Sequence, residues 1–333
     1  MMKKTISQCM IVKNEEKNIR RALSWGKDIM CEQIVVDTGS SDRTVEIARE
    51  MGAKIFFFPW INDFAAAKNF AIDQAKGDWI AFLDADESFT PEDAAKIPEI
   101  LEYVGDDVDG LLTGIVDLDE NNHITSGGTM IRFFVNRPDL RYVGKIHEHL
   151  VRKGESGLHL TDATKQLAFL HTGYQEQEKK DKSKFERNLN IILEILKQEP
   201  ENCDYLGYLG DTYSSDGKNE EARDAYKKAV AAMPEKLGVY DQRSSYTYTN
   251  LLRVSQCLNA PEAEVEAIYK EAVEKLPKEP DFDCVMGDWY WRKGQYEKAV
   301  QMYELAIAKL ETYGTVNRGI ITTSMLIQKY ECL

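Results

Sequence analysis

Two carboxylates, Asp84 and Asp86, stand one residue apart directly after the apolar run Trp79–Leu83. Alternate side chains of an extended segment point the same way, so both carboxylates can face one ligand. Hard oxygen donors of this kind suit Mg²⁺ or Mn²⁺, which commonly binds substrate phosphates as well. Such an ion stabilises a leaving diphosphate as a Lewis acid. Acidic turns after strands are common, so the pair alone does not establish a metal site.

Two other polar clusters follow apolar runs earlier in the chain. Lys13–Glu16 comes after the run Ile6–Val12, and Asp37–Asp42 has the sequence DTGSSD. A carboxylate such as Asp37 can accept hydrogen bonds from a ribose hydroxyl or a base. Gly39 allows close backbone approach, and a helix start behind it offers donors to an anion. The same residues also satisfy a plain strand–turn–helix cap, so both interpretations stay open for this cluster.

The elements that position these clusters are short apolar runs that alternate with helix-like segments over the first 110 residues. This alternation predicts a mainly parallel sheet, in which ligands bind beyond the carboxyl ends of the strands. The predicted strands are 6–12, 33–37, 54–58 and 78–84, and the predicted helices are 15–25, 43–51, 65–76 and one that opens at Thr90-Pro91. A more β-rich region follows, with predicted strands at 111–116, 130–135, 142–150 and 166–170.

The second half of the chain consists of long Lys- and Glu-rich helices and contains a repeat. Residues 203–234 and 286–306 carry the same bulky, Gly, Tyr, Ala and aromatic positions at the same offsets, with a degenerate copy between them. These offsets are those of the tetratricopeptide repeat. Unrelated amphipathic helices are the alternative. The change of character places the domain boundary near residues 175–180.

Composition limits the classes of function. A chain of 333 residues suggests two domains. The net charge of −14 argues against a nucleic-acid partner, which needs clustered Lys and Arg. The first apolar stretch is too short for a signal peptide and no later run reaches transmembrane length, so we expect a cytoplasmic protein without a transmembrane segment. The six cysteines show no C-x-x-C pair.

The segments CMIVKNEE, VVDTGSSDRT and AAAKNFAIDQAKGDWIAFLDADE, in this order, resemble the motifs of the family 2 glycosyltransferases, which have a GT-A fold. The resemblance covers most of residues 5–110. Together with the repeats, the layout is similar to bacterial peptide or protein glycosyltransferases, including those that glycosylate bacteriocins on cysteine. It implies a Rossmann-like α/β GT-A domain over residues 1–177 that binds a nucleotide sugar. An all-α tetratricopeptide-like domain then follows over residues 178–333.

The resemblance also implies an activity and its residues. A hexose or N-acetylhexosamine would move with inversion from a nucleoside-diphosphate sugar, UDP being the best match, to a peptide or protein acceptor with the help of Mn²⁺ or Mg²⁺. Asp37 would hold the base or ribose, and Asp84 the ribose or the metal. The implied contacts with the nucleotide sugar are Val12, Glu15, Asp37, Lys68, Asp84 and Ala85. The implied metal ligands are Asp84, Asp86 and His171. A solvated helix lysine remains the alternative for Lys68, and a structural histidine the alternative for His171.

An inverting transferase needs a base that deprotonates the acceptor as it attacks. The segment Gly144–His149 resembles the I-H-E element of tailed members of this family, so we expect Glu148 to be the base and His147 its neighbour or a metal ligand. This differs from the more familiar acidic-pair motif. Because adjacent residues on a strand face opposite ways, both side chains need not reach one site.

Two other functions compete with a peptide transferase. A tetratricopeptide scaffold with a catalytically silent α/β domain would explain the helical tail equally well, but it predicts decay of the acidic motifs, and both are intact. A transferase acting on lipid-linked or cell-surface glycans would keep the chemistry and change the acceptor. The repeats favour a polypeptide acceptor or a homodimer formed through the tail, since such arrays present extended concave surfaces.

Overall fold

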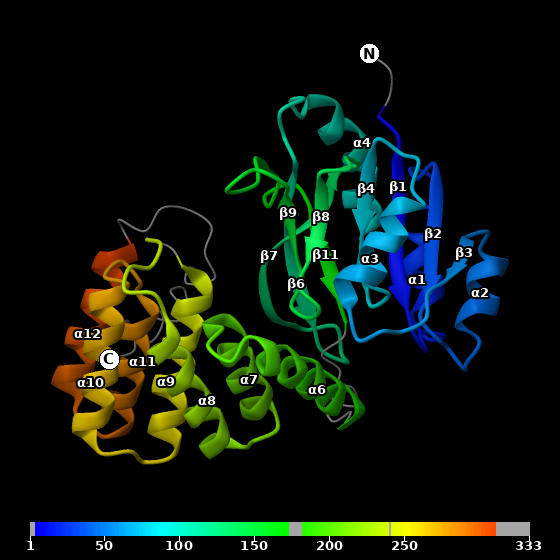
Figure 1. Ribbon diagram of the computed structural model, residues 1–333. Coiled ribbons are helices and arrows are strands. Elements are labelled where there is room, and N and C mark those ends of the chain that lie inside the picture. The colour runs from blue at the N-terminus through cyan, green and yellow to red at the C-terminus, as the bar shows by residue number, and fades with distance from the viewer. Residues whose placement is uncertain (1–3, 173–181, 240, 311–333) are drawn as a thin grey trace. The chain divides into compact units, whose positions relative to one another are not determined.

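A computed structural model describes residues 4–172, 182–239 and 241–310 of the chain (Figure 1). The chain divides into two compact units, Met1–Asp181 and Lys182–Leu333. The boundary predicted from the sequence, between residues 177 and 178, lies outside the described residues.

The first unit is built on a mixed nine-stranded sheet in the order β3-β2-β1-β4-β7-β6-β11-β5, with β10 paired to β6. Its first four strands pair in parallel, as the sequence predicts. β7 then runs antiparallel to β4 and to β6. The strands are β1 (Ile6–Val12), β2 (Glu32–Asp37), β3 (Lys54–Phe57), β4 (Trp79–Phe82), β5 (Glu87–Phe89), β6 (Gly110–Leu118), β7 (Ile124–Val135), β10 (Leu160–Asp162) and β11 (Ala168–His171). Of these, β5 and β10 were not predicted.

Helices cover both faces of this sheet, which explains why its central strands read as continuous apolar runs. Alternate residues of β1 enter different clusters: Cys9 packs with α3 (Phe64–Asp73), and Met10 packs with α1 (Ile19–Ser24) and α2 (Thr44–Glu50). α4 (Pro91–Tyr103) packs in a third cluster with Phe133 and Phe169.

The predicted helix over residues 15–25 begins later than expected. Asn14 has a positive φ of 59°, and the carbonyl of Glu15 accepts the N–H groups of Asn18 and Ile19 in a turn. The regular helix α1 therefore starts at Ile19. The six residues between β1 and α1, 13–18, therefore form a loop at the end of the strand.

The strand predicted over residues 142–150 is wrong. The structure has a two-stranded sheet of β8 (Leu140–Val143) and β9 (His149–Arg152) with a turn between them. Gly144 and His147 take positive φ values of 94° and 54°, which no extended strand adopts. The two candidate catalytic residues of this segment, His147 and Glu148, therefore lie on a hairpin loop.

The second unit is a succession of antiparallel helix pairs. Its helices are α6 (Lys182–Gln198), α7 (Cys203–Ser215), α8 (Asn219–Ala232), α9 (Gln242–Cys257), α10 (Glu262–Lys275), α11 (Asp281–Arg292) and α12 (Tyr296–Leu310). A Cβ added to Gly210 would lie 2.4 Å from the ring of Tyr226, and one added to Gly287 would lie 2.5 Å from the ring of Tyr303. The two predicted repeats thus use the same glycine–tyrosine contact, which allows the paired helices to approach closely.

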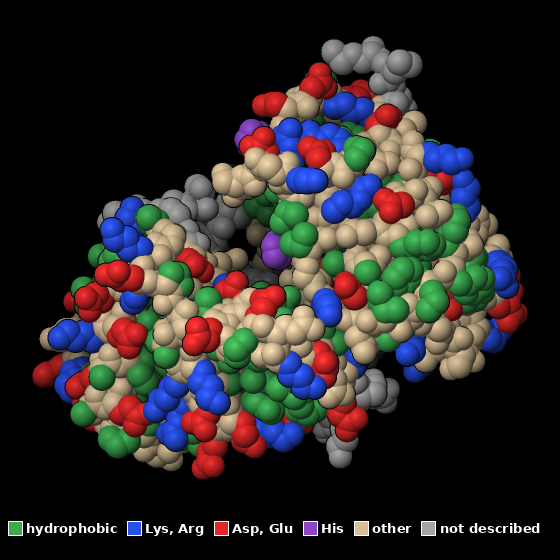
Figure 2. All heavy atoms as spheres, in the orientation of Figure 1, with side chains coloured by type: hydrophobic (Ala, Val, Ile, Leu, Met, Phe, Trp, Pro, Cys, Tyr) green, Lys and Arg blue, Asp and Glu red, His purple; other side chains and the backbone are tan. Residues whose placement is uncertain are grey.

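The surface of each unit carries interspersed acidic and basic side chains on the face shown in Figure 2. The same view shows hydrophobic side chains gathered over β3 and α3, and the exposed large hydrophobics include Phe57 and Ile61 from these elements and their connection. Within the described residues, no helix is long and apolar enough to cross a membrane.

Candidate active site

The parallel strands β1, β2 and β4 bring the three polar clusters of the sequence to one edge of the sheet. The last residues of β1 and β2, Val12 and Asp37, are register partners, and β4 pairs with β1 on its other side. The loops after these strands therefore meet at their carboxyl ends, where open α/β sheets bind ligands.

Asp37 organises the loop after β2. Its buried carboxylate accepts the backbone N–H groups of Gly39 at 3.1 Å and of Ser40 at 3.1 and 3.2 Å. Gly39 has a φ of 113°, which other residues rarely adopt. Thr38 donates its N–H and its hydroxyl to the carbonyl of Val12 at 2.9 and 3.0 Å. These bonds hold the ends of β1 and β2 together.

The remaining residues expected near the nucleotide lie along the same edge. Val12 and Ala85 are buried in one apolar cluster with residues of α1. Glu15 lies in the loop after β1, and its carboxylate accepts a hydrogen bond of 2.9 Å from Asn18 Nδ2. The structure thus places Val12, Glu15, Asp37 and Ala85 around the ends of adjacent strands.

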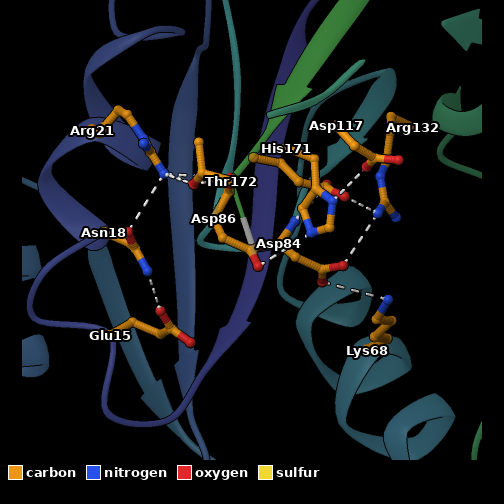
Figure 3. A network of polar contacts seen from close by, with 11 residues as sticks. Glu15, Asn18, Arg21, Lys68, Asp84, Asp86, Asp117, Arg132, His171 and Thr172 are labelled. Atoms are coloured by element: carbon orange, nitrogen blue, oxygen red, sulfur yellow. Dashed lines mark hydrogen bonds and ion pairs between the residues drawn. The ribbon is translucent and has the colours of Figure 1, made fainter. Parts of the chain in front are cut away.

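His171 lies between two carboxylates because of strand register. On β11 it is the register partner of Asp117 on the parallel strand β6 and of Glu87 on the antiparallel strand β5. Its Nδ1 lies 2.8 Å from Asp117 Oδ1, and its Nε2 lies 3.4 Å from Asp86 Oδ2 (Figure 3). Ser126 donates to the other oxygen of Asp117 in a short hydrogen bond.

The two carboxylates beside His171 favour a positive charge at its ring. Burial lowers the pKa of His171, but hydrogen bonds to Asp86 and Asp117 outweigh it and raise the pKa to about 9. With Nδ1–H donated to Asp117, Nε2 and the Asp86 oxygen are two acceptors that face one another. Either a proton or a metal ion between them satisfies both.

Arg21 connects this histidine segment to α1. Its Nη2 donates to the hydroxyl of Thr172 at 2.7 Å and to the carbonyl of Asp86 at 3.4 Å, and Asn18 Oδ1 accepts from it at 3.4 Å. Thr172 in turn donates its N–H to the Asp86 carbonyl at 3.1 Å. Figure 3 shows this chain of contacts running from Glu15 to His171.

The other carboxylate of the acidic pair, Asp84, faces two buried cations. Its Oδ2 lies 3.1 Å from Arg132 Nη2, and its Oδ1 lies 3.7 Å from Lys68 Nζ. Arg132 also pairs closely with Glu87, and Glu87 accepts the backbone N–H of Asp84 at 3.0 Å. Glu87 therefore supports Asp84 through its backbone and through their shared partner Arg132.

The pKa values of this cluster follow from the pairing. Desolvation would raise the pKa of Asp84, but Lys68 and Arg132 lower it to about 2. Burial raises the pKa of Glu87 to about 7 although Arg132 opposes the shift. Burial lowers the pKa of Arg132, but Glu87 and Asp84 outweigh it and raise that pKa. Asp84 is thus an anion near neutral pH, with 41% of its side chain exposed to receive a ligand.

The expected base, Glu148, lies next to Lys68. The Lys68 ammonium is 2.8 Å from Glu148 Oε1, and 5% of the Lys68 side chain is exposed. The alternative interpretation of Lys68 as a solvated helix lysine is therefore wrong. His147 is exposed on the same hairpin loop, before Glu148.

Sequence reasoning missed several residues of this network, among them Arg21, Asp117, Arg132 and Thr172. A signal existed for Arg132, because a single charge inside the apolar run MIRFFV of a central strand requires a buried partner. No comparable signal marks Asp117, which stands in an acidic stretch that also fits a solvated turn. Its role depends on the pairing of β6 with β11.

The side chains of Asp86 and His171 fit a divalent cation whose remaining coordination positions a substrate fills. Across the described parts of the chain, no group of three or more His, Cys, Asp and Glu side chains is arranged to hold a metal ion. Asp86 and His171 do converge, and Asp117 fixes the histidine tautomer in the way that metal-bound histidines are commonly held. Mg²⁺ is commonly bound by one or two carboxylates together with substrate phosphates.

Comparison with known proteins agrees with this architecture. Residues 7–151 match the model of glycosyl transferase family 2, and residues 205–235 and 285–314 match models of the tetratricopeptide repeat. The first unit therefore contains a family 2 glycosyltransferase domain with a GT-A-like mixed sheet, and tetratricopeptide repeats follow it in the second unit. The family and the layout expected from the sequence motifs are confirmed.

The chain is similar to curated proteins of the same class. The glycosyltransferase SunS of Bacillus subtilis is 33% identical over 231 residues, which cover 68% of this chain and 53% of that protein. A tetratricopeptide repeat-containing protein of Synechococcus elongatus is 29% identical over 91% of this chain and 75% of its own length. An uncharacterised glycosyltransferase of Rickettsia bellii is 40% identical over 31% of this chain and 34% of its own. The chain thus spans about half the length of SunS.

Solved structures show only a partial likeness. Glucosyl-3-phosphoglycerate synthase from Mycobacterium tuberculosis, solved with Mn²⁺ and UDP, is 21% identical over 35% of this chain and 44% of its own, with a TM-score of 0.28. A likeness this limited identifies neither the substrate nor the metal of the present chain.

Proposed function

We propose that this chain is an inverting glycosyltransferase that moves a hexose or N-acetylhexosamine from a UDP-sugar to a peptide or protein acceptor. The observation that carries the proposal is the convergence of Asp84, Asp86 and His171 at the carboxyl end of β4, with Glu148 across the Lys68 ammonium. Paired carboxylates and a histidine at such an edge suit the binding of a metal-bound diphosphate.

The donor would bind along the ends of β1 and β2. We assign the base pocket to the segment from Val12 to Glu15 and the base or ribose to Asp37. The backbone N–H groups of Gly39 and Ser40 donate to the Asp37 carboxylate, and these hydrogen bonds hold the loop after β2 in one conformation. Asp84 and the backbone of Ala85 would contact the ribose.

We assign the cation, Mn²⁺ or Mg²⁺, to Asp86 and His171, with Asp84 as a further ligand through its exposed oxygens. When bound, the ion supplies Lewis-acid stabilisation of the charge that develops on the diphosphate as it leaves. Asp117 keeps the His171 ring oriented, and Arg21 and Thr172 hold the backbone of Asp86.

Glu148 would act as the base, with His147 as its neighbour on the loop. The acceptor hydroxyl or thiol attacks the anomeric carbon, its proton passes to a Glu148 carboxylate oxygen, and the bond from that carbon to the β-phosphate oxygen breaks. UDP leaves with the electron pair, and the sugar inverts at the attacked carbon. Lys68 contacts Oε1 of Glu148, and Oε2 is the oxygen we assign to the acceptor proton.

The tetratricopeptide repeats support a polypeptide acceptor, because arrays of this kind present extended surfaces to peptides. The layout of a family 2 domain with such a tail also resembles that of bacterial peptide and protein glycosyltransferases, as the sequence motifs suggested. A homodimer through the tail stays a prediction of the sequence, as does a cytoplasmic location.

Calorimetric titration of the full chain with UDP, with and without Mn²⁺, tests the proposal. We expect UDP to bind more tightly with Mn²⁺, and Asp86→Ala to remove this difference while leaving the melting temperature nearly unchanged. A screen of UDP-sugars, read by release of UDP, then identifies the sugar through slow hydrolysis of the donor. If no nucleoside diphosphate shows metal-dependent affinity, the enzymatic proposal is rejected and a helical scaffold with a silent α/β domain remains.

A further inference from the structure

The Lys68 ammonium lies between carboxylates from two separate segments of the first unit. It is 2.8 Å from Glu148 Oε1 on the β8–β9 loop and 3.7 Å from Asp84 Oδ1 after β4. The rings of Phe82 and Tyr142 enclose the ammonium on other sides, each with its centroid at 5.1 Å. A buried cation is costly unless it is paired, so these carboxylates hold it in place. Lys68 likewise fixes where the Glu148 oxygen can lie.

Asn69, the next residue of α3, attaches the same hairpin by a second route. Its Oδ1 accepts the backbone N–H of Tyr142 at 2.9 Å, and its Nδ2 donates to the Tyr142 carbonyl at 2.9 Å. The N–H of Phe64 at the start of α3 donates to the carbonyl of Lys145 at 2.8 Å. Helix α3 therefore holds strand β8, the loop and the Glu148 carboxylate through separate contacts.

The Glu148 carboxylate lies on an irregular part of the hairpin. Gly144 and His147 take positive φ values, so the loop is an irregular turn without ladder hydrogen bonds of its own. Among the described residues, Lys68 is the partner of the Glu148 carboxylate. The position of that carboxylate relative to Asp84 thus depends on α3.

We propose that Lys68 and Asn69 are positioning residues for Glu148, and that Lys68 serves this task instead of binding the nucleotide. This inference rests on the proposed function, in which Glu148 is the base. Lys68 is committed to two carboxylates within its aromatic surroundings, whereas a diphosphate ligand needs a cation that can reach solvent. Reaction rates are sensitive to such positioning, since a displacement of about 1 Å can cost about 100-fold.

The test uses the full chain with Mn²⁺ and the one among UDP-glucose, UDP-galactose and UDP-N-acetylglucosamine that the unmodified chain hydrolyses fastest. Water takes the place of the acceptor, and release of UDP gives kcat and KM. The dissociation constant of UDP is measured separately by calorimetry. The variants are Lys68→Met, Lys68→Arg and Asn69→Ala, with Glu148→Gln as reference. Gln74→Ala is the matched control, because Gln74 directly follows α3 and its side chain donates a hydrogen bond to the Phe70 carbonyl of that same helix.

For Lys68→Met we expect a loss of about 100-fold in kcat, a UDP dissociation constant within about threefold of the unmodified chain, and no further loss when Glu148→Gln is added. Lys68→Arg should restore part of the rate because it keeps the charge. Asn69→Ala should lower kcat in the same way with no change in UDP binding. This variant removes no buried charge, so it keeps the test informative if Lys68→Met does not fold. Gln74→Ala should behave as the unmodified chain.

Two results overturn the inference. If Lys68→Met weakens UDP binding by the factor by which it raises KM, with kcat unchanged, Lys68 binds the nucleotide. If Lys68→Met and Asn69→Ala keep a normal kcat while Glu148→Gln is inactive, Glu148 is the base but α3 does not position it. A normal rate in Glu148→Gln rejects the proposed base together with this inference.

Discussion

Three charged side chains of the first unit, Lys68, Glu87 and Arg132, are almost fully buried beside the acidic pair. A buried charge is tolerated when it is paired, and each of these has a partner of opposite sign within the site. The same pairing holds Asp84 and Glu148 in place through contacts within the protein itself. In an enzyme such preorganisation lowers the reorganisation that accompanies reaction.

Among single residues, we expect the substitution Glu148→Gln to separate the chemical step from substrate binding. Glutamine keeps the shape of the side chain but cannot take up a proton, so the rate of sugar transfer should fall by about 10²- to 10⁴-fold. UDP should still bind in the presence of Mn²⁺. Release of UDP measures the rate of transfer, and calorimetry measures the affinity for UDP. A variant that turns over normally would assign the base to another residue.

The Asp117 carboxylate offers a second test, because it holds the His171 ring through Nδ1. Asp117→Ala should weaken Mn²⁺ binding in the presence of UDP by about 10- to 100-fold, as loss of such a partner commonly does. The exposed Glu120 on the same β-hairpin gives the control variant Glu120→Ala. Equal Mn²⁺ affinity in the two variants would contradict a metal role for His171.

Individual elements show which contacts the repeats depend on. Gly210 and Gly287 lie against the rings of Tyr226 and Tyr303, and each tyrosine hydroxyl donates to an aspartate one residue after the glycine, at 2.8 and 2.7 Å. The repeat therefore preserves a hydrogen bond as well as a packing contact. Equivalent contacts at equivalent positions are what a stack of similar helix pairs requires.

Helix α11 begins with a carboxylate that should make stability depend on pH. Burial, with a contribution from Glu279, raises the pKa of Asp281 to about 6, although Arg253 opposes the shift. Its Oδ1 has no hydrogen-bond partner among the residues the structure describes. An acid whose pKa is higher in the folded state than in the unfolded state, where it is near 3.9, favours folding while it is protonated.

The stabilisation should thus be complete below about pH 4 and be lost as the pH rises through 6, a change of up to about 3 kcal/mol. Asp281→Asn should remove this dependence and raise the urea midpoint at pH 7.5 relative to the unmodified chain. Urea unfolding of both proteins at pH 4.5 and 7.5 makes the comparison. If both midpoints shift equally with pH, the titrating group is not Asp281.

The whole molecule joins a catalytic unit to a helical one, and each has its own apolar core. Separate cores predict that removing residues 182–333 leaves the donor site intact. We expect the shortened chain to bind UDP and Mn²⁺ as before. Its KM for a peptide acceptor should rise tenfold or more, equal to about 1.4 kcal/mol of binding.

Donor hydrolysis, acceptor kinetics and sedimentation of the two chains test this division of labour. Sedimentation also tests the predicted homodimer, which should be lost with the tail. An unchanged acceptor KM and an unchanged oligomeric state would show that the repeats serve neither acceptor binding nor assembly.

The sequence by itself determined the features that depend on local patterns. Alternating apolar runs and helical segments predicted the four parallel strands, and the fixed offsets around Gly210 and Gly287 predicted the repeats, because burial imposes the side-chain period on each element separately. Strand ends likewise placed Asp37, Asp84 and Asp86 at one edge, since parallel strands share the direction of their carboxyl ends.

Only the tertiary structure decided which side chains meet. Asp117 and His171 stand 54 residues apart and are joined by the register of β6 with β11. Arg132 reaches Glu87, 45 residues earlier in the chain, across the sheet. The hairpin loop of Glu148 replaced a predicted strand because Gly144 and His147 turn the chain. Strand pairing and left-handed turns depend on contacts between distant segments, and no local spacing encodes them.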